Sequence, residues 1–176
     1  MPAPIATVEE FYAHALAIER EAAARYSEFA QHFEDRGEDV LAGLCHKLAG
    51  LELEHFRDLL AACGEMSLPA IAADEYRWLG TGSPEAPARE LVFRVATPRH
   101  LLEIALKAEV RAREFFVWLA RTAPTKAVRE LAGVMAAEEM EHVGWVRQAL
   151  EYHGATAADW DALLAEGIGP GSVTPD

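Results

Sequence analysis

Apolar residues recur every three or four positions along four long stretches of the chain, which is the spacing of one face of an α-helix. These stretches predict helices over about 7–34, 38–62, 97–121 and 126–153. The first is expected to begin with a capping box, because Thr7 is followed three residues later by Glu10. The third is expected to begin at Thr97, which precedes a proline suited to the first helical turn. The sequence therefore predicts an all-helical fold.

The lengths of the connections predict how these helices are arranged. The first and second are joined by a few residues, as are the third and fourth, so each pair is expected to form an antiparallel hairpin. A much longer segment, 63–96, separates the hairpins and is expected to cross over the bundle, with a short helix around 70–79. We therefore predict a single domain over 1–176, made of hairpin 7–62, crossover 63–96, hairpin 97–154, and a short helix with a tail over 155–176.

The two predicted hairpins form an internal repeat, and the repeat carries a motif. Glu52-Leu-Glu-His55 in the second helix returns as Glu139-Met-Glu-His142 in the fourth, at an offset of 87 residues. The first and third helices match at a constant offset of 90 residues. Because a duplicated hairpin packed against itself has pseudo-twofold symmetry, inward-facing residues of the two halves are expected to lie face to face.

An isolated glutamate also lies on the apolar face of each remaining helix. Glu19 falls at the centre of the apolar face of the first helix, and Glu109 is its counterpart in the third. An ionised carboxylate that is buried without a partner costs several kcal/mol, and two shared dications would offset that cost. Two Glu-x-x-His pairs with two lone glutamates form the ligand set of a di-metal site in a four-helix bundle. The predicted metal ligands are Glu19, Glu52, His55, Glu109, Glu139 and His142.

The chemistry of this set explains its spacing. Residues three apart on a helix are neighbours, so one helix can offer a carboxylate and an imidazole to the same ion. Remaining carboxylates can bridge two ions about 3.5–4 Å apart. Nitrogen and oxygen ligands without a thiolate suit iron or manganese, and zinc also fits such a site. A single Glu-x-x-His is usually a solvated pair, and the duplication is what favours a metal site.

Other polar residues receive a structural interpretation. Glu54, Glu138 and Glu141 are expected at the surface, and Arg113 as a snorkelling surface residue. Tyr26 is interpreted either as core packing or as a residue whose hydroxyl reaches a carboxylate or oxygen at the metals. Its counterpart Phe116 has no hydroxyl. Surface positions are also expected for the histidines outside the repeat, which are His14, His32, His46, His100 and His153. The four tryptophans are interpreted as packing or interface residues.

Composition narrows the classes of function. The net charge of −13 over 176 residues disfavours binding to nucleic acid or to an anionic membrane. The chain has no apolar run long enough to span a membrane and no secretory signal at its start, which predicts a cytoplasmic protein. Cys45 and Cys63 lie on one predicted helix roughly 27 Å apart, too far for a disulfide, and are interpreted as buried thiols.

The six-residue pattern, together with Tyr26, resembles the ferritin-like superfamily and most of all the rubrerythrin di-iron domain, over about residues 7–153. The resemblance implies a ferritin-like antiparallel four-helix bundle that binds two iron ions, with Glu52 and Glu139 as bridging ligands. Two differences stand out. Rubrerythrins carry a further carboxylate one turn after the third-helix ligand, where this chain has Ala112. The chain also lacks the Cys-x-x-Cys pairs that form a rubredoxin domain. Electrons are therefore expected from a separate donor protein or small reductant.

Three classes of function follow from this resemblance. The first is an oxidoreductase, in which a di-iron site reduces peroxide or dioxygen. The second is a ferroxidase that serves iron storage or transfer, and the third is a helical bundle without catalytic activity. Hydroxylation of an organic substrate is a related option that would require a pocket beside the metals. A homodimer is expected because helical bundles with an apolar outer stripe often dimerise.

Overall fold

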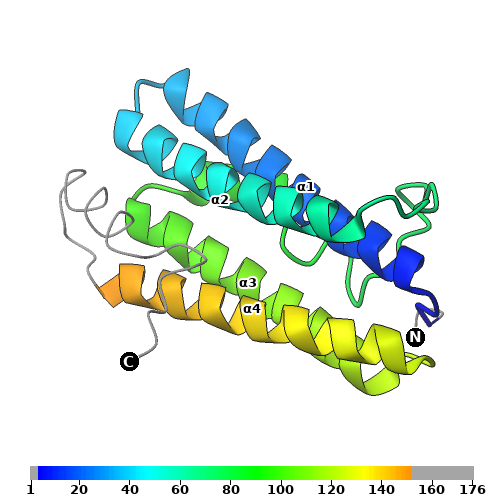
Figure 1. Cartoon of the computed structure of the whole chain (residues 1–176). Helices are drawn as coiled ribbons and strands as arrows, with labels where there is room; N and C mark the ends of the chain where they lie inside the picture. The colour runs from blue at the N-terminus through cyan, green and yellow to red at the C-terminus, as the bar shows by residue number, and fades with distance from the viewer. Residues whose placement is uncertain (1–3, 152–176) are drawn as a thin grey trace.

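The computed structural model describes residues 4–151, which fold into four long α-helices and one 3-10 helix (Figure 1). The elements are α1 (Val8–Glu34), α2 (Asp39–Cys63), η1 (Arg89–Arg94), α3 (Pro98–Thr122) and α4 (Lys126–Glu151). Helix α1 packs along α2 and helix α3 along α4, so the bundle consists of two antiparallel hairpins laid against each other. The predicted fold class, an all-helical antiparallel four-helix bundle built from two hairpins, is confirmed. The expected end of the fourth helix at His153 and the short helix expected within 155–176 lie outside the described residues.

Local sequence signals begin and end the helices where expected. The hydroxyl of Thr7 accepts a hydrogen bond from the backbone N–H of Glu10, whose side chain in turn binds the backbone of Thr7, forming the predicted capping box. Thr97 caps α3 in the same way through the N–H of His100 at 3.2 Å. The α1–α2 turn contains Gly37 with φ of +70°, a conformation that side chains with a Cβ rarely adopt.

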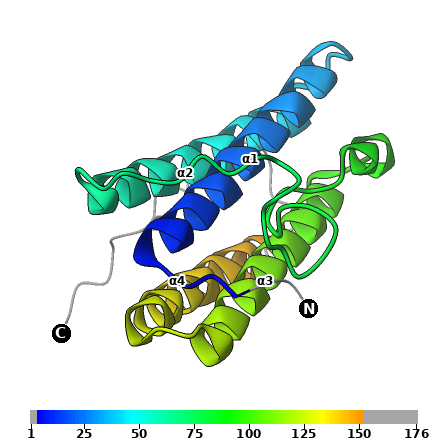
Figure 2. The same cartoon turned by 90° about the vertical axis from the view of Figure 1, so that its right-hand side faces the viewer.

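The crossover between α2 and α3 follows the α1 and α3 side of the bundle (Figure 2). The prediction of a short helix around 70–79 is wrong: this stretch is irregular, with one turn at 73–75, and the short helix is η1 instead. The reason is visible at Arg77, whose backbone N–H donates to the ring of His14 on α1 rather than to a helical carbonyl. The crossover is therefore held by contacts to the bundle and not by its own helical hydrogen bonds.

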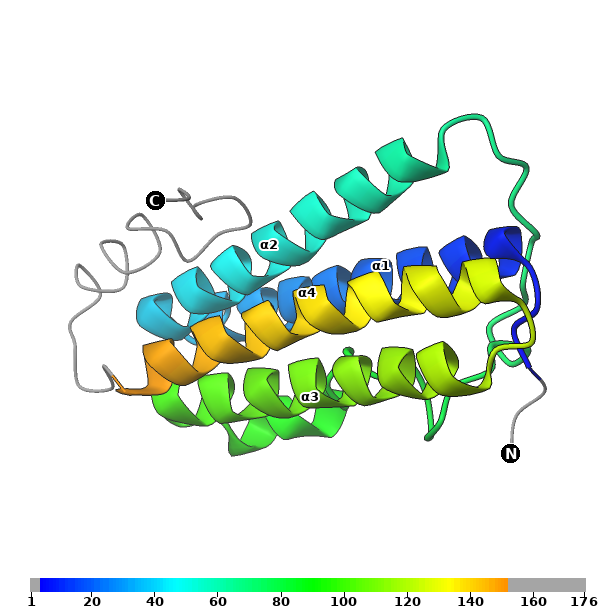
Figure 3. The ribbon, with the colours of Figure 1, turned by 60° about the horizontal axis from the view of Figure 1, so that its bottom comes forward.

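The core consists of two apolar clusters, one towards each end of the bundle. One contains Phe33, Leu41 and Val146, and the other contains Phe11 and Leu119. The middle of the four helices lies between the clusters, and the inward glutamates are found there. Helix α2 diverges from α4 towards its C-terminal end (Figure 3), and the crossover covers the opposite side.

Two further expectations concern single features of the chain. Cys45 and Cys63 are both buried free thiols, as predicted, and burial raises the pKa of Cys45 to about 12. Among the helices of residues 4–151, none has a stretch long and apolar enough to cross a membrane.

Candidate metal centre

The first of two matched groups lies where α1 and α2 face each other. Glu19 stands at the middle of the buried face of α1 and is fully buried. Glu52 and His55 are one turn apart on α2. The Nδ1 atom of His55 lies 3.6 Å from Oε2 of Glu19 and 3.6 Å from Oε2 of Glu52. Each of these three side chains offers a ligand atom within 4.8 Å of the other two.

The second group repeats this geometry between α3 and α4. The Nδ1 atom of His142 lies 3.5 Å from Oε2 of Glu109 and 3.4 Å from Oε2 of Glu139. All three side chains are buried. The duplicated motif has therefore folded into duplicated geometry, with each histidine directed at two carboxylates of its own hairpin.

The two groups adjoin at their histidines. The rings of His55 and His142 are stacked with their centroids 4.1 Å apart and their planes 8° apart. Trp145 also stacks on His142, with the ring centroids 4.7 Å apart. Its interpretation as a packing residue was right, but the ring it packs on belongs to the candidate centre. All six predicted ligands thus meet at one place in the middle of the bundle.

Many polar atoms of this place lack hydrogen-bond partners within the protein. Buried side-chain oxygen and nitrogen atoms are nearly always hydrogen-bonded in folded proteins. In residues 4–151, most of the buried polar atoms without a hydrogen-bond partner belong to seven side chains. These are Glu19, Glu52, His55, Glu85, Glu109, Glu139 and His142. Such a concentration of unpartnered oxygen and nitrogen atoms fits bound cations, and the donor set without thiolates suits iron, manganese or zinc.

The pKa values of the candidate ligands also favour a bound cation. Burial raises the pKa of Glu19 and of Glu52 well above the usual value of a carboxyl group, and neighbouring carboxylates raise it further. Burial alone lowers the pKa of His142, but its contacts with Glu109 and Glu139 outweigh burial and raise it. The metal-free centre therefore holds protons that a dication would displace, so metal binding is expected to release protons.

Glu85 is the member of this cluster that the sequence analysis missed. It comes from the crossover, is fully buried, and offers a ligand atom within 4.8 Å of ligand atoms of Glu109, Glu139 and His142. No helical periodicity marks a residue in an irregular segment. The one signal in the sequence is an acidic residue between two close prolines, in Ser83-Pro-Glu-Ala-Pro87.

The hydroxyl of Tyr26 is fully buried and has no hydrogen-bond partner. Burial raises the pKa of Tyr26 well above its usual value, and the charges of Glu52, Glu109 and Glu85 raise it further. Tyr26 is therefore a neutral hydroxyl donor near the carboxylates. It is part of the core, as one of the two interpretations had it.

Several expectations about surface residues hold, and one does not. Glu54, Glu138 and Glu141 are exposed. The surface prediction for His14 is wrong, because the side chain is only 1 % exposed. Its Nδ1 atom lies 2.7 Å from the carbonyl oxygen of Glu10, and its Nε2 atom accepts the N–H of Arg77 at 3.1 Å. The sequence could not show that the crossover covers this face of α1.

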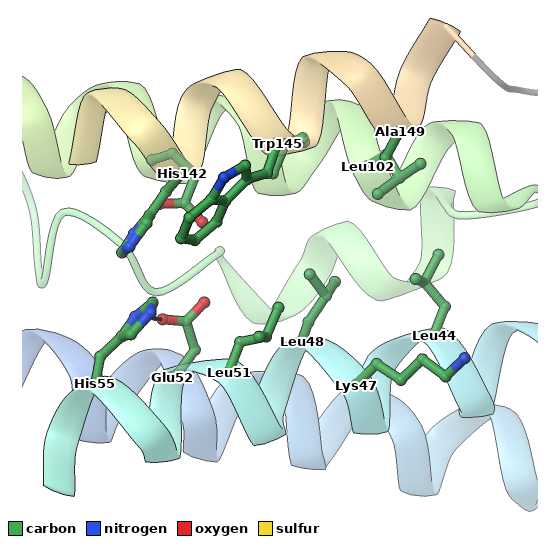
Figure 4. Close-up of a pocket in the computed structure, with 12 residues that line it drawn as sticks. Leu44, Lys47, Leu48, Leu51, Glu52, His55, Leu102, His142, Trp145 and Ala149 are labelled. Atoms are coloured by element: carbon green, nitrogen blue, oxygen red, sulfur yellow. Dashed lines mark ion pairs between the residues drawn. The ribbon is translucent and has the colours of Figure 1, made fainter. Parts of the chain in front are cut away.

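Two cavities reach the histidine side of the centre. The first, of about 40 Å³, lies between α2 and α4 and is apolar apart from the ligands and Lys47 (Figure 4). Leu48, Leu51, Leu102 and Trp145 contribute to its lining, with Glu52 and both histidines at one end. A cavity of this size holds one to a few molecules as small as water. It suits a small oxidant better than an organic substrate.

The second cavity, of about 430 Å³, lies where α2 diverges from α4 (Figure 3). Glu19 and both histidines line its inner part, and the exposed carboxylates of Asp58, Glu138 and Glu141 also line it. Glu138 lines the same cavity as His55 and His142, and burial raises the pKa of its carboxyl group. This cavity is an acidic approach from solvent to the candidate ligands.

An antiparallel bundle in which two Glu-x-x-His pairs and two further glutamates converge has the architecture of the ferritin-like carboxylate proteins. A scan against protein-family models finds no match, and neither does a search of curated proteins. Among solved structures, the chain is similar to COG1633, an uncharacterized conserved protein from Magnetospirillum magnetotacticum MS-1, with a TM-score of 0.60 and 30 % sequence identity. The match covers 82 % of this chain and 94 % of that one. The chain belongs to the COG1633 family of conserved proteins.

Proposed function

We propose that this chain binds two iron ions at the centre formed by Glu19, Glu52, His55, Glu109, Glu139 and His142, and that it reduces peroxide or dioxygen there. The observation that carries this proposal is the pair of matched Glu/His groups, most of whose side chains have buried oxygen or nitrogen atoms without a hydrogen-bond partner. Iron, when bound, would supply one electron from each ion, and two electrons with two protons convert hydrogen peroxide into two waters. Electrons would return from a separate donor protein or a small reductant.

The chain's own residues have distinct parts in this proposal. Glu52 and Glu139, with Glu19 and Glu109, would supply the carboxylates that hold the two ions, and His55 and His142 would each supply a ring nitrogen to one of them. The apolar side chains around the small cavity would keep bulk water away from that side of the ions, while the cavity would admit peroxide or dioxygen. The buried hydroxyl of Tyr26, which has no hydrogen-bond partner in the protein, would donate a hydrogen bond to a carboxylate that holds the ions.

The test is an anaerobic Fe(II) titration of the metal-free chain, followed by near-infrared circular dichroism. We expect a break at two irons per chain that is lost in Glu52→Ala and in Glu139→Ala. Glu54→Ala is the matched control, because Glu54 lies on the same helix as Glu52 but is exposed. Binding without a defined break, or no binding, would reject the di-iron proposal and favour a bundle without catalytic activity. Mixing the loaded protein with peroxide or with dioxygen then identifies the faster oxidant.

A second function, ferroxidase activity for iron storage or transfer, is favoured by the acidic cavity. Asp58, Glu138 and Glu141 would attract Fe(II) and pass it to the inner ligands. Under this alternative, repeated addition of Fe(II) and oxygen would accumulate more than two ferric ions per chain or transfer them to an acceptor. Under the leading proposal, turnover stops after one oxidation unless a reductant is present.

The expected homodimer is likewise a proposal. Exposed apolar residues on α2 and α4, including Leu53, Leu60 and Val134, would be at least partly covered in it. Light scattering after size-exclusion chromatography distinguishes a dimer from a monomer and from the larger closed assembly that iron storage requires.

A further inference from the structure

Glu85 is a carboxylate in an unusual position for a crossover residue. Its side chain has 0 % exposure, and neither carboxylate oxygen has a hydrogen-bond partner. Loop carboxylates normally stay in water, because burying one without a partner costs several kcal/mol. No protein donor compensates for its burial, and a bound cation would do so.

The surroundings of Glu85 are those of a candidate metal ligand. Its ligand atom lies within 4.8 Å of ligand atoms of Glu109, Glu139 and His142, which are the three candidate ligands of the α3/α4 hairpin. Three carboxylates so close together repel one another, and a cation between them removes the repulsion. The corresponding group on α1 and α2 contains no fourth member among the described residues.

The crossover is fastened on both sides of Glu85. The Nε atom of Arg111 on α3 donates to the carbonyl oxygen of Pro84 at 2.7 Å. Arg25 on α1 donates to the carbonyl oxygen of Pro87. Further along, Arg89 forms two hydrogen bonds with Glu28 on α1, at 2.7 and 2.8 Å. These contacts, with two prolines that restrict the backbone, fix where the carboxylate of Glu85 can reach.

We infer that Glu85 is a seventh ligand, bound to the ion of the α3/α4 hairpin and supplied by the crossover rather than by a helix. This inference rests on the proposed metal centre. Position 112, one turn beyond Glu109 on α3, holds a buried alanine and offers no ligand. Glu85 raises the number of carboxylates at the centre to five against a charge of +4 on two divalent ions. It makes the two metal positions unequal and favours the oxidised, more highly charged pair.

The experiment compares the wild-type chain with Glu85→Gln, Glu85→Ala and the control Glu90→Gln, which changes an exposed glutamate on the same segment. Metal-free protein is titrated with Co(II), whose visible absorption reports ligand number and geometry at each position. We expect two ions per chain in the wild type and in Glu90→Gln. In both Glu85 variants, one of the two ions should bind at least about tenfold more weakly, with a changed Co(II) spectrum. After iron loading, the reduction potential should be higher in Glu85→Gln than in the wild type.

The outcomes distinguish the role of Glu85 from the proposed di-metal centre on which it rests. Two ions bound with unchanged affinity and spectrum in both Glu85 variants would overturn the role of Glu85 and leave the di-metal centre intact. Failure of the wild type to bind two ions would overturn both. Misfolding is checked by melting the metal-free proteins: Glu85→Gln should be at least as stable as the wild type, because it removes a buried unpaired carboxylate. A folded variant with weakened binding therefore supports the ligand role.

Discussion

The α1/α2 and α3/α4 hairpins offer the same three side chains to the middle of the bundle in nearly the same geometry. In each hairpin, a histidine Nδ1 atom lies 3.4–3.6 Å from two glutamate oxygens. This likeness follows from the repeat, because a helix fixes the relative positions of residues three apart and a duplicated hairpin reproduces them. The helices thus account for the symmetric part of the centre.

The two hairpins differ in what surrounds these three side chains. The α3/α4 group has Glu85 beside it, while the α1 helix has the hydroxyl of Tyr26 where α3 has Phe116. His14, which binds the crossover, has Ile104 as its counterpart on α3. All three differences lie outside the duplicated ligands, so the asymmetry of the centre comes from the crossover and from single substitutions. The following predictions test the likeness first and then each difference.

Metal removal should have the largest effect, because it affects both hairpins equally. Two ions, each present at about 100 times its dissociation constant, would together stabilise the fold by about 5 kcal/mol. For a chain of this size, that corresponds to a rise in melting temperature of about 10–20 °C. Differential scanning calorimetry of loaded and metal-free protein measures it. Equal melting temperatures would mean that the centre contributes nothing to the folded state.

The matched substitutions Glu19→Gln and Glu109→Gln should lower metal affinity to different extents in the two hairpins. Glu19→Gln leaves one carboxylate and one histidine in the α1/α2 group, whereas Glu109→Gln leaves two carboxylates and a histidine because Glu85 remains. We expect the affinity for one ion to fall about 100-fold in the first variant and about tenfold in the second. Calorimetric titration measures both, and equal losses would show that the hairpins bind metal alike.

Substituting Tyr26 by Phe, or its counterpart Phe116 by Tyr, should have a smaller effect, on the free energy of unfolding. Tyr26→Phe removes a buried hydroxyl without a partner, so the metal-free protein should gain about 1–2 kcal/mol of unfolding free energy. Phe116→Tyr adds a hydroxyl to a side chain packed against Phe11 and Phe115, and should lose a similar amount. Denaturant unfolding gives both values. If Tyr26 donates a hydrogen bond in the loaded protein, its replacement should give no gain there.

The smallest effect concerns His14 and depends on pH. Burial lowers the pKa of His14 below the unfolded value of 6.5, so the folded chain holds the neutral ring. Below pH 6.5 the unfolded chain gains a proton that the folded chain resists, and the stabilisation by His14 is lost as the pH falls through this window. The stability difference between wild type and His14→Gln, both metal-free, should therefore shrink between pH 7.5 and 5.5. Exposed His100→Gln is the control.

The sequence was sufficient to predict the helices and the convergence of the six candidate ligands that they carry, because both follow from periodicity. Glu19 could be placed in the core by its position on the apolar face of α1, and the repeat gave its counterpart Glu109. Glu85 and His14 could not be placed in this way. Glu85 lies in a segment without a period, and His14 faces away from the centre of the bundle towards that same segment. What the sequence did not reveal is the path of the crossover, which depends on individual contacts such as those of Arg25 and Arg111.

The position of Glu85 has a consequence for how the chain is held together. An ion shared by Glu85, Glu109 and Glu139 would join the crossover to α3 and α4, and would thereby close a loop in the chain as a covalent cross-link does. Unlike a disulfide, this cross-link could be formed and removed at equilibrium by the supply of metal. The segment around Pro84 and Pro87 would then be the part of the protein whose amide exchange with solvent reports most directly whether the ion is in place.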